Sequence, residues 1–393
     1  MHVMKILLFE SKRLSYDSSW CFMEMFRRGL ERLGADVTVC LLENIQRQEK
    51  ELESFCSMGF EAVFDINSAL VAAEMDGNYY LDCLDAPFYH IIVDHPLHVH
   101  AALQIPLQNY HVICLDHYHK EYLEKYYPHI KKVYVMPFGG ILAEEFNDEY
   151  KILPMEKRPY HILFPGTYTP LVYYQQQMDA KGEFYREIAE EILLEYQRGS
   201  QKTIDELFME KSESDGSFFA MKMHKARFID RYIREWYREQ ILESLLSRDV
   251  VVDVVGFRWE MYHGSGSHNL RIHEPCSYAQ QLAMLGQSKM VLNVQPLFLD
   301  GIHDRVMNAM MNQSVAVTDG CCWLQENFSE TEEFFRYDKN HPEEMASWVK
   351  ENREENPKLE DLTQKVYRKV KDGHSWYERV KVLMQEIGIV GKI

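Results

Sequence analysis

Short apolar runs that alternate with helical patterns constrain the fold of this chain more than any other feature. Within the first 140 residues these runs are Lys5–Phe9, Val37–Leu41, Ala62–Ile66, Tyr89–Val93, His111–Leu115 and Lys132–Met136. Helices are predicted between them, the first over residues 18–33 with Ser18 or Ser19 as N-cap, and another near 117–126. Strands that alternate with helices in this way form a parallel sheet covered on both faces. The first part of the chain is therefore predicted to be a Rossmann-like domain.

The same alternation begins again after residue 158, but one long helical stretch interrupts it. The apolar runs of this second part are Tyr160–Tyr168, Asp249–Phe257, Lys289–Val294 and Ser314–Asp319. Residues 171–248 are charged and helical in pattern, without a strand signal. We therefore predict an α/β fold of two tandem Rossmann-like domains, with a helical insertion in the second half and C-terminal helices.

The boundary between the two domains is expected near residues 140–158, where Gly139, Gly140 and Pro154 punctuate the chain. The predicted parts are an N-terminal domain at 1–150, a C-terminal domain at 158–375 that contains the insertion at about 171–248, and a C-terminal helix at 376–393. Ligands of such sheets bind at the carboxyl ends of the strands, so functional residues are expected where the predicted strands end.

The formal net charge of -18 at pH 7 restricts the partners of the chain. A surface that binds nucleic acid over a wide area is basic, so nucleic acid is not an expected partner. A small anion site lined by a few arginines remains compatible with this charge. The apolar runs are too short for a transmembrane helix, and the 8 cysteines form no CxxC pair. We expect a cytoplasmic protein with reduced thiols and no transmembrane segment.

Polar residues gather in the turn and helix that follow the third predicted strand of the second part. Asp300-Gly301 is a turn dipeptide, and the helix is predicted to begin near residues 302–304. The free N–H groups and the positive dipole end of such a helix suit a phosphate, and Arg305 in the first turn adds a planar set of donors. The alternative is an ordinary surface turn in which Asp300 caps the helix and Arg305 pairs with Asp304.

The segment D-G-x-x-x-R-V-x-x-A-M-x-x-x-x-V-A-V-T-D, residues 300–319, resembles the nucleotide-sugar-binding segment of GT-B glycosyltransferases of the group 1 type. It is most similar to the spore-maturation-type bacterial branch, and the resemblance covers about residues 160–330. It implies a GT-B arrangement of two domains and metal-independent transfer from a nucleotide diphosphate sugar, with a UDP-sugar favoured. It implies no further cofactor, and the acceptor would be a saccharide, a protein or a small molecule.

The resemblance also implies roles for individual residues. Group 1 enzymes carry two acidic residues with seven others between them, the first beside the transferred sugar and the second at the ribose. Here these positions are Asp300 and Asn308, and the asparagine can still hydrogen-bond a hydroxyl. The other residues that the resemblance places at the donor are Gly166, Thr167, Gly256, Phe257, Arg258, Asn293, Gly301, Ile302, His303, Asp304 and Arg305. Many members carry Arg and Lys after the first glycine turn, but GTYTPLVYYQQQ has neither. Arg258, Arg271, Arg305 or helix N-termini are therefore expected to hold the diphosphate.

A second candidate cluster, IIVDHPLHVH, follows a predicted strand of the first domain. Asp94 and His95 lie just past this strand. A carboxylate next to an imidazole could remove the proton of the acceptor, and the resemblance implies that this loop or its neighbour lies close to the reacting sugar. The alternative is that Asp94 caps the next helix and His95 is structural. No metal site is predicted, because His98 and His100 are two apart and would point to different sides of a helix.

Several smaller expectations complete this interpretation. Asp116 is expected to cap the helix near 117–126, and Ser15, Tyr16 and Asp17 could line the acceptor side. The chain has neither GxGxxG near its first strand nor GxxxxGK[ST], which argues against a dinucleotide enzyme and a P-loop ATPase. Two other functions remain open: a non-catalytic sugar-nucleotide-binding or scaffold protein, and a nucleotide-sugar epimerase. Residues 171–248 are a hypothetical determinant of acceptor choice.

Overall fold

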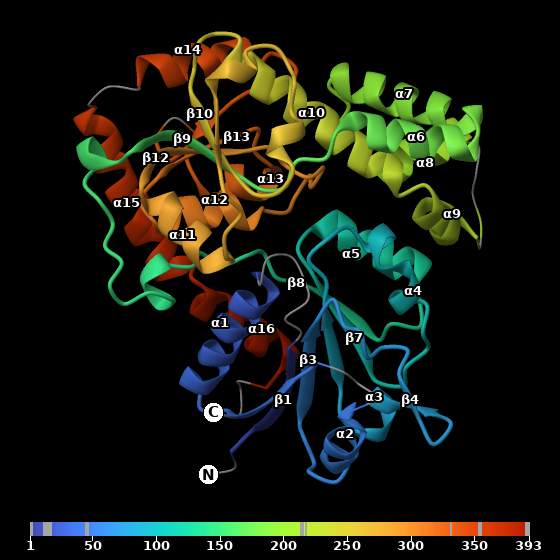
Figure 1. Cartoon of the computed structure of the whole chain (residues 1–393). Coiled ribbons are helices and arrows are strands. Elements are labelled where there is room, and N and C mark those ends of the chain that lie inside the picture. Colours follow the sequence, from blue (N-terminus) through green and yellow to red (C-terminus); the bar gives the residue numbers. More distant parts are fainter. Residues whose placement is uncertain are drawn as a thin grey trace. The chain divides into compact units, whose positions relative to one another are not determined.

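The computed structural model describes residues 3–10, 18–43, 47–212, 216, 218–330, 332–352 and 356–389, which form two compact units (Figure 1). Unit 1 takes in residues 1–139 together with 374–393, and unit 2 takes in 140–373. The C-terminal helix, α16 (Trp376–Ile387), belongs to unit 1 and packs on α1 (Ser18–Arg32). The two helices approach closely at Gly29, where a Cβ atom would lie 3.0 Å from the side chain of Val380.

Unit 1 is built on a sheet of six parallel strands in the order β2-β1-β3-β6-β7-β8. These strands are β1 (Lys5–Glu10), β2 (Asp36–Leu41), β3 (Ala62–Ile66), β6 (Phe88–Ile91), β7 (Tyr110–Cys114) and β8 (Lys132–Val135). Besides α1 and α16, its helices are α2 (Glu49–Phe55), α3 (Tyr80–Cys83), α4 (His100–Leu103) and α5 (His117–Tyr126), with a 3-10 turn at Pro96–His98. A short antiparallel pair, β4 (Glu74–Met75) and β5 (Asn78–Tyr79), was not expected from the sequence.

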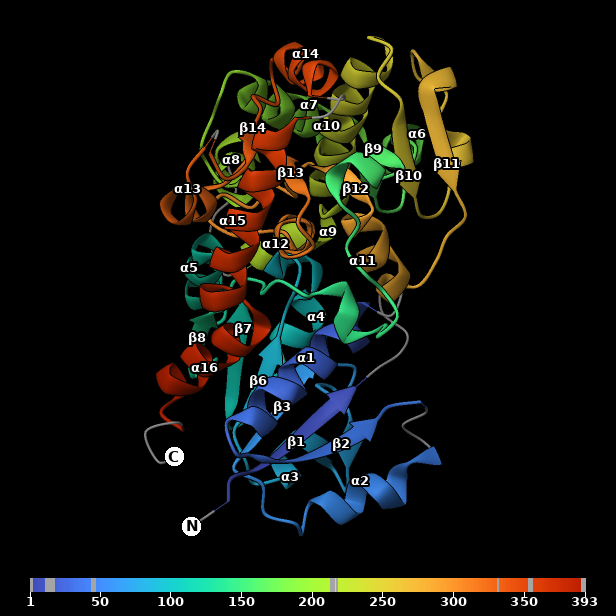
Figure 2. The ribbon, with the colours of Figure 1, turned by 90° about the vertical axis from the view of Figure 1, so that its left-hand side faces the viewer.

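Unit 2 is built on a second sheet of six parallel strands, in the order β11-β10-β9-β12-β13-β14. These strands are β9 (Tyr160–Pro165), β10 (Val252–Val255), β11 (Leu270–His273), β12 (Ser288–Asn293), β13 (Val315–Thr318) and β14 (Phe335–Arg336). The helices that alternate with them are α11 (Tyr278–Gly286), α12 (Asp304–Met311), α13 (Cys322–Asn327), α14 (Glu343–Glu351) and α15 (Pro357–Gly373). Short 3-10 turns lie at Ala143–Glu145, Met155–Lys157, Trp259–Met261 and Ser267–Asn269. Helix α15 packs along α12 (Figure 2).

The helical insertion of unit 2 lies between its first two strands. It consists of α6 (Leu171–Lys181), α7 (Glu183–Gln197), α8 (Ile204–Ser212), α9 (Phe219–Lys225) and α10 (Phe228–Leu246). Helix α10 packs against both α6 and α7, and α7 packs against α8, so these helices cover one another's apolar faces (Figure 1). The predicted fold class, two tandem Rossmann-like units of GT-B type with a helical insertion and C-terminal helices, is confirmed.

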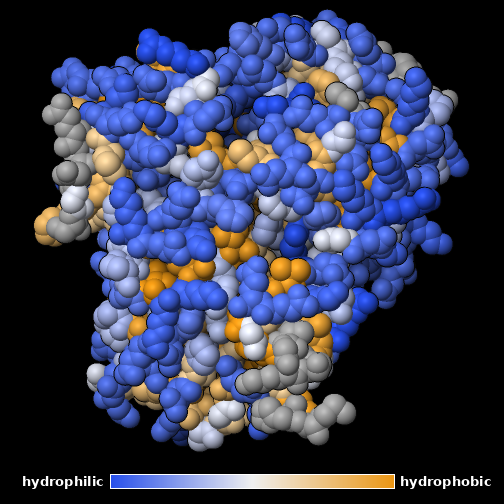
Figure 3. Space-filling view, turned by 180° about the vertical axis from the view of Figure 1, so that it is seen from behind, coloured by the Kyte–Doolittle hydropathy of each residue, from blue (hydrophilic) through white to orange (hydrophobic). Residues whose placement is uncertain are grey.

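The central strands lie in the interior of each unit, which explains their continuous apolar sequences. All positions of β3 and β12 are buried, and β1 is buried after its first residue. Hydrophilic residues cover most of the face drawn in Figure 3, in agreement with the high net charge. Among the described helices, none is long and apolar enough to cross a membrane.

Candidate functional site

The order of the strands in unit 2 marks one position on its sheet. β9 and β12 are neighbours, although β10 and β11 come between them in the chain, so the strand order reverses between β9 and β12. Ligands of open parallel sheets bind at this reversal, outside the carboxyl ends of the strands. β9 leads into Gly166 and Thr167, and β12 ends at Asn293. Three residues predicted from the sequence therefore flank the reversal.

Two glycine turns touch each other beside this position. Gly166 and Gly256 both have a φ of 141°, and a Cβ atom on Gly256 would lie 2.3 Å from the carbonyl oxygen of Gly166. The N–H of Gly166 donates to the carbonyl of Val255 at 2.9 Å, and Nε1 of Trp259 donates to the carbonyl of Gly166 at 2.7 Å. The backbone of Gly166 leaves no room for a side chain at Gly256, and the positive φ favours glycine at both positions.

Arg305 reaches the reversal from the first turn of α12. Its Nη1 donates to Oδ1 of Asn293 at 2.8 Å, and its guanidinium lies 5.4 Å from the centre of the Phe164 ring. Its Nη2 lies 3.2 Å from where a Cβ atom of Gly166 would be. Within the described ranges, no carboxylate forms an ion pair with it. Burial and the charge of Arg238 lower the pKa of Arg305 to about 10, so it stays positive at neutral pH.

Asn293 is held so that its carbonyl oxygen faces Arg305. Its Nδ2 donates to Oε1 of Gln295 at 3.1 Å and to Oγ1 of Thr318 at 3.0 Å, so the amide cannot turn without losing both bonds. The hydroxyl of Tyr337 donates to its backbone carbonyl at 2.7 Å. Asn293 is completely buried, so a network of neutral groups orients the arginine.

A second arginine, Arg238, reaches the same glycine turn from α10. Its Nη1 donates to the carbonyl of Thr167 at 2.9 Å and to Oε1 of Glu235 at 2.7 Å. Its Nη2 lies 3.1 Å from the Cβ position of Gly166, and its guanidinium is 5.1 Å from the centre of the Phe164 ring. In the part of the chain that the structure describes, neither this Nη2 nor that of Arg305 has a hydrogen-bond acceptor. Two guanidinium groups therefore converge on Gly166, and the Nη2 donor of each has no acceptor among the described residues.

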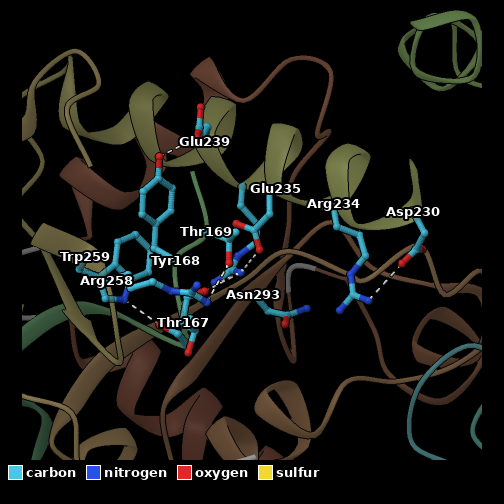
Figure 4. A network of polar contacts seen from close by, with 12 residues as sticks. Thr167, Tyr168, Thr169, Asp230, Arg234, Glu235, Glu239, Arg258, Trp259 and Asn293 are labelled. Atoms are coloured by element: carbon cyan, nitrogen blue, oxygen red, sulfur yellow. Dashed lines mark hydrogen bonds and ion pairs between the residues drawn. The ribbon is translucent and has the colours of Figure 1, made fainter. Parts of the chain in front are cut away.

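Further polar contacts surround this pair (Figure 4). Nη2 of Arg258 donates to Oγ1 of Thr169 at 3.2 Å, and Arg258 has a left-handed backbone with a φ of 69°. The hydroxyl of Tyr168 donates to Oε1 of Glu239 at 2.7 Å, while its ring stacks on Trp259 at 5.4 Å. The predicted residue Arg258 is thus part of the same network. Arg271 is not, because it lies on the edge strand β11, exposed and 3.9 Å from Asp253.

The N-terminus of α12 differs from the expectation. His303 is the N-cap residue, and its Nδ1 lies 3.2 Å from the backbone nitrogen of Arg305. The same Nδ1 is 2.6 Å from Oδ1 of Asp304, and the hydroxyl of Tyr278 donates to Oδ2. Burial alone would raise the pKa of Asp304, but these two partners lower it well below its usual range. Asp300 therefore does not cap this helix, and Asp304 is bound by His303 and Tyr278.

The side-chain amide of Asn308, which the resemblance places at the ribose, is hydrogen-bonded within unit 2. Its Oδ1 accepts from the backbone N–H of Ile141 at 2.8 Å, and its Nδ2 donates to the hydroxyl of Tyr278 at 2.7 Å. Asn312, one turn further on, accepts from the N–H of Ala143 at 2.9 Å and donates to the carbonyl of Ile141 at 2.8 Å. The two asparagines bind the segment that enters unit 2. The amide of Asn308, which is almost completely buried, is therefore already used within the protein.

Asp300 lies half-buried in the loop between β12 and α12. The loop is fixed by a hydrogen bond from Nε2 of Gln295 to the carbonyl of Gly301 at 3.1 Å and by the complete burial of Ile302. Leu297 has a φ of 58°, which is rare for a branched side chain and costs energy that the surrounding structure has to supply. The loop is thus held in a defined conformation next to the reversal. The predicted catalytic role of Asp300 stays a prediction.

In unit 1 the structure gives Asp94 and His95 different surroundings. His95 caps the 3-10 turn at Pro96–His98, because its Nδ1 accepts from the N–H of Leu97 at 3.1 Å. Its ring is buried and lies edge-on to His119, with the ring centres 4.6 Å apart. This hydrogen bond uses Nδ1 of His95, and the catalytic role predicted for His95 stays a prediction. The cap expected from Asp94 is thus made by His95, and the half-buried Asp94 remains the candidate base.

The remaining expectations for unit 1 concern a helix cap, three loop residues and a metal site. Asp116 caps α5 as expected, with its Oδ1 accepting from the N–H of Tyr118 at 2.7 Å. Ser15, Tyr16 and Asp17 lie outside the described residues. Among the residues that the structure does describe, no group of three or more His, Cys, Asp or Glu side chains could hold a metal ion.

The sequence did not reveal Arg238 and Glu235, which lie in the charged helical stretch. The only available signal was the spacing of Arg231, Arg234 and Arg238 at three and four residues, which puts positive groups on one side of a helix. The same spacing is common on solvated helix faces, so it could not single out the one arginine that reaches the sheet.

A family described as "Glycosyl transferase-like" matches residues 234–385, which run from α10 to the C-terminal helix. No curated protein matches the chain in sequence. Several solved structures share its fold over nearly the whole length. A glycosyltransferase from Rickettsia africae is 11% identical, with a TM-score of 0.57 and 100% of both chains covered. The family match at residues 234–385 includes Arg238, Asn293 and Arg305.

Two further structures of this fold contain a nucleotide or a nucleotide sugar. The Anabaena protein HepE in complex with UDP-glucose is 11% identical, with a TM-score of 0.57, and 98% of this chain and 99% of that chain are covered. An alpha-glucosyltransferase in complex with UDP and a 13-mer DNA is 11% identical, with a TM-score of 0.59 and 100% of both chains covered. At such low identity the likeness concerns the fold.

Proposed function

We propose that this protein is a glycosyltransferase that moves a sugar from a nucleotide diphosphate sugar, with a UDP-sugar favoured, to an acceptor. The single observation that carries the proposal is the position of Arg305. It lies at the strand reversal of unit 2, half-buried, oriented by Asn293 and without an ion pair among the described residues. A partly desolvated cation without an ion-pair partner is costly unless an anion binds to it. The diphosphate of the donor is such an anion.

The chemistry follows from where charge develops. When the bond between sugar and diphosphate breaks, negative charge builds up on the departing diphosphate. Arg305 is fixed in place before the reaction, so it stabilises this charge without reorganisation and without a divalent cation. Asp300, on the neighbouring loop, is the proposed group beside the transferred sugar. Asp94 of unit 1 is the proposed base for the acceptor, which can be a saccharide, a protein or a small molecule.

Two comparisons support a nucleotide sugar as donor. The family match covers the strand and helix that carry Asn293 and Arg305. Structures of the same fold have been determined with UDP and with UDP-glucose. One of them also contains DNA, but the net charge of -18 in this chain opposes a nucleic-acid acceptor.

The proposal is tested by measuring binding and turnover in the same preparation. We expect UDP and UDP-glucose to raise the melting temperature of the protein, because both bind only the folded state. Arg305→Gln should weaken UDP binding by about 1000-fold in calorimetry, since a charge contact with the diphosphate is lost. Exposed Arg231→Gln, which removes the same charge from α10, is the matched control. Unchanged UDP binding in Arg305→Gln would contradict the proposal.

The hydrogen bonds of Asn308 favour one other function, because a group expected at the ribose is used elsewhere. The protein could bind nucleotide sugars without transferring the sugar. Incubation with labelled UDP-glucose and candidate acceptors separates the two. Release of UDP with a labelled product supports the transferase, and binding without any product supports the scaffold. Conversion to an isomeric UDP-sugar without acceptor would indicate an epimerase.

A further inference from the structure

The proposed donor site lacks two groups that the resemblance led us to expect. The segment GTYTPLVYYQQQ, which begins at Gly166 after the first strand of unit 2, contains no arginine or lysine. The amide of Asn308 is already hydrogen-bonded within the protein. The diphosphate would then meet Arg305 with little other charge, and a hydroxyl of the ligand would lack its acceptor. The helix α10 brings one cationic and one anionic side chain to this same place, Arg238 and Glu235; Figure 4 labels Glu235 on this helix.

Arg238 has the geometry of a diphosphate ligand. Its Nη1 is anchored on the carbonyl of Thr167 and on Glu235, so the guanidinium is fixed. Its Nη2 lies at the turn of Gly166 beside Nη2 of Arg305, with Phe164 below both groups. Two like charges held together above an apolar ring repel each other, and an anion bound between them removes this cost.

Glu235 has the geometry of a hydroxyl acceptor. The residue is 8% exposed, and its Oε1 accepts from Arg238 at 2.7 Å. Its Oε2 is buried and has no hydrogen-bond partner among the described residues. A buried carboxylate oxygen without a donor is destabilising, and a hydroxyl group of a bound ligand would satisfy it. Sugars and riboses offer such hydroxyls, whereas inorganic pyrophosphate offers none at neutral pH that a carboxylate would favour.

We propose that α10 completes the donor site: Arg238 binds the diphosphate together with Arg305, and Glu235 accepts a hydrogen bond from a hydroxyl of the same nucleotide sugar. This inference rests on the proposed function, since it assigns further contacts to the same donor. Both groups that the chain lacks at the expected positions are then supplied by the insertion. Glu235 also holds Arg238 in place, so this one pair of side chains on α10 both positions the cation and contacts the ligand.

The test compares three ligands in calorimetry on the full chain: inorganic pyrophosphate, UDP and UDP-glucose. Arg238→Gln should bind pyrophosphate and UDP about 30-fold more weakly, because a charge-assisted contact is lost. Glu235→Gln should bind UDP-glucose about tenfold more weakly, while pyrophosphate binding is not weakened. Arg231→Gln, on the same helix but exposed, should stay within about twofold for every ligand.

The outcomes separate this inference from the proposed function. If Arg305→Gln loses UDP binding and Arg238→Gln does not, the role of α10 is wrong and the donor site stands. If neither variant loses binding, the donor site itself is wrong. If Glu235→Gln weakens pyrophosphate as much as UDP-glucose, Glu235 only positions Arg238 and the hydroxyl contact is wrong. Arg238→Lys keeps the charge but not the planar fork, so it separates these two contributions to binding. Circular dichroism of each variant shows whether a loss of binding comes from unfolding.

Discussion

The carboxyl edges of the two sheets both carry polar side chains, but these side chains differ in how their hydrogen bonds are satisfied. In unit 2, Arg238 and Arg305 converge on Gly166 and keep donors that the described part of the protein does not satisfy. In unit 1, His95 and Asp116 lie after corresponding strands, and each caps the turn or helix that follows it. Both edges are polar in sequence, but in unit 2 the Nη2 groups of these two arginines have no acceptor among the described residues. Polar residues after a strand therefore indicate a ligand site only when local capping leaves them free.

The interior of unit 1 differs from the candidate site of unit 2, because two of its buried titratable groups, Asp65 and His90, are neutral. Asp65 of β3 lies opposite His90 of β6 in the register of the sheet. Burial raises the pKa of Asp65 to about 8 and lowers the pKa of His90 to about 3, so both are uncharged at neutral pH. Nε2 of His90 accepts from the N–H of Ser68 at 3.0 Å, and its Nδ1 lies 2.8 Å from the hydroxyl of Tyr110. In unit 1 burial leaves Asp65 and His90 neutral, whereas in unit 2 the half-buried Arg305 keeps its charge at neutral pH.

The largest predicted effect concerns Asp65→Asn and the pH dependence of stability. The folded protein holds a proton on Asp65 up to pH about 8, whereas the unfolded chain releases it near pH 4. Folding therefore loses free energy as pH rises from about 4 to 8, at about 1.4 kcal/mol per unit. Between pH 5 and pH 8 the loss for this one group is on the order of 4 kcal/mol.

Urea unfolding of the wild type and Asp65→Asn at pH 5, 6.5 and 8 measures this loss. The asparagine cannot titrate, so the difference in unfolding free energy between the two proteins should shift by this amount across the series in favour of the variant. A constant difference at all three pH values would show that Asp65 is ionised in the folded state, and the contrast between the two units would fail.

A second prediction compares two glycines of unit 2 that have similar backbones. Gly166 and Gly182 have φ values of 141° and 110°, so alanine is strained at both. Only at Gly166 would the new Cβ atom meet Arg238 and Arg305, at 3.1 and 3.2 Å, while Gly182 has nothing within 4 Å. Gly166→Ala should therefore weaken UDP binding by about 100-fold, or roughly 3 kcal/mol. Calorimetry should find binding in Gly182→Ala close to wild type, and equal losses would show that strain alone matters.

The third prediction concerns Asn308, which the resemblance assigned to the ribose. Asn308→Ala removes the acceptor of the Ile141 N–H and leaves that buried group unpaired, at a cost of about 2 kcal/mol in unfolding free energy. Its effect on UDP affinity should be less than about threefold, because its amide is already used. Asn312→Ala, which removes a similar contact to Ala143, is the control and should behave in the same way. A selective loss of UDP binding in Asn308→Ala would restore the ribose contact.

The sequence predicted most elements of the fold, because the signals involved are local. The helix expected at 117–126 coincides with α5, and the apolar runs coincide with the buried strands. The strand β11 was missed because it lies at the edge of its sheet, where Arg271 and Ile272 are exposed and no buried run marks it. The order of the strands, which places the reversal between β9 and β12, depends on long-range pairing that no local pattern contains.

The same limit applies to the candidate site. Arg305 could be found because it belongs to a continuous strand, turn and helix. Arg238 and Thr167 are 71 residues apart in the chain, and only the folded insertion brings them together. Two of the groups expected at the donor, the N–H of Arg305 and the amide of Asn308, have neighbours within the protein, His303 and Ile141, that the sequence did not indicate. Sequence patterns show which donors and acceptors exist but not which are already paired.

The smallest predicted effect concerns His95→Asn, which tests whether the carboxyl edge of unit 1 uses this histidine for capping alone. Asparagine is a good N-cap residue, so the bond to Leu97 is kept and stability should change by less than about 1 kcal/mol. Because the imidazole is buried with its Nδ1 occupied, UDP release from UDP-glucose should stay within about twofold of wild type. Asp94→Asn is the comparison, and as the proposed base it should slow the same reaction by at least about 100-fold. A large loss of turnover in His95→Asn at unchanged melting temperature would instead make the histidine the base, and the edge of unit 1 would then be a reactive surface like that of unit 2.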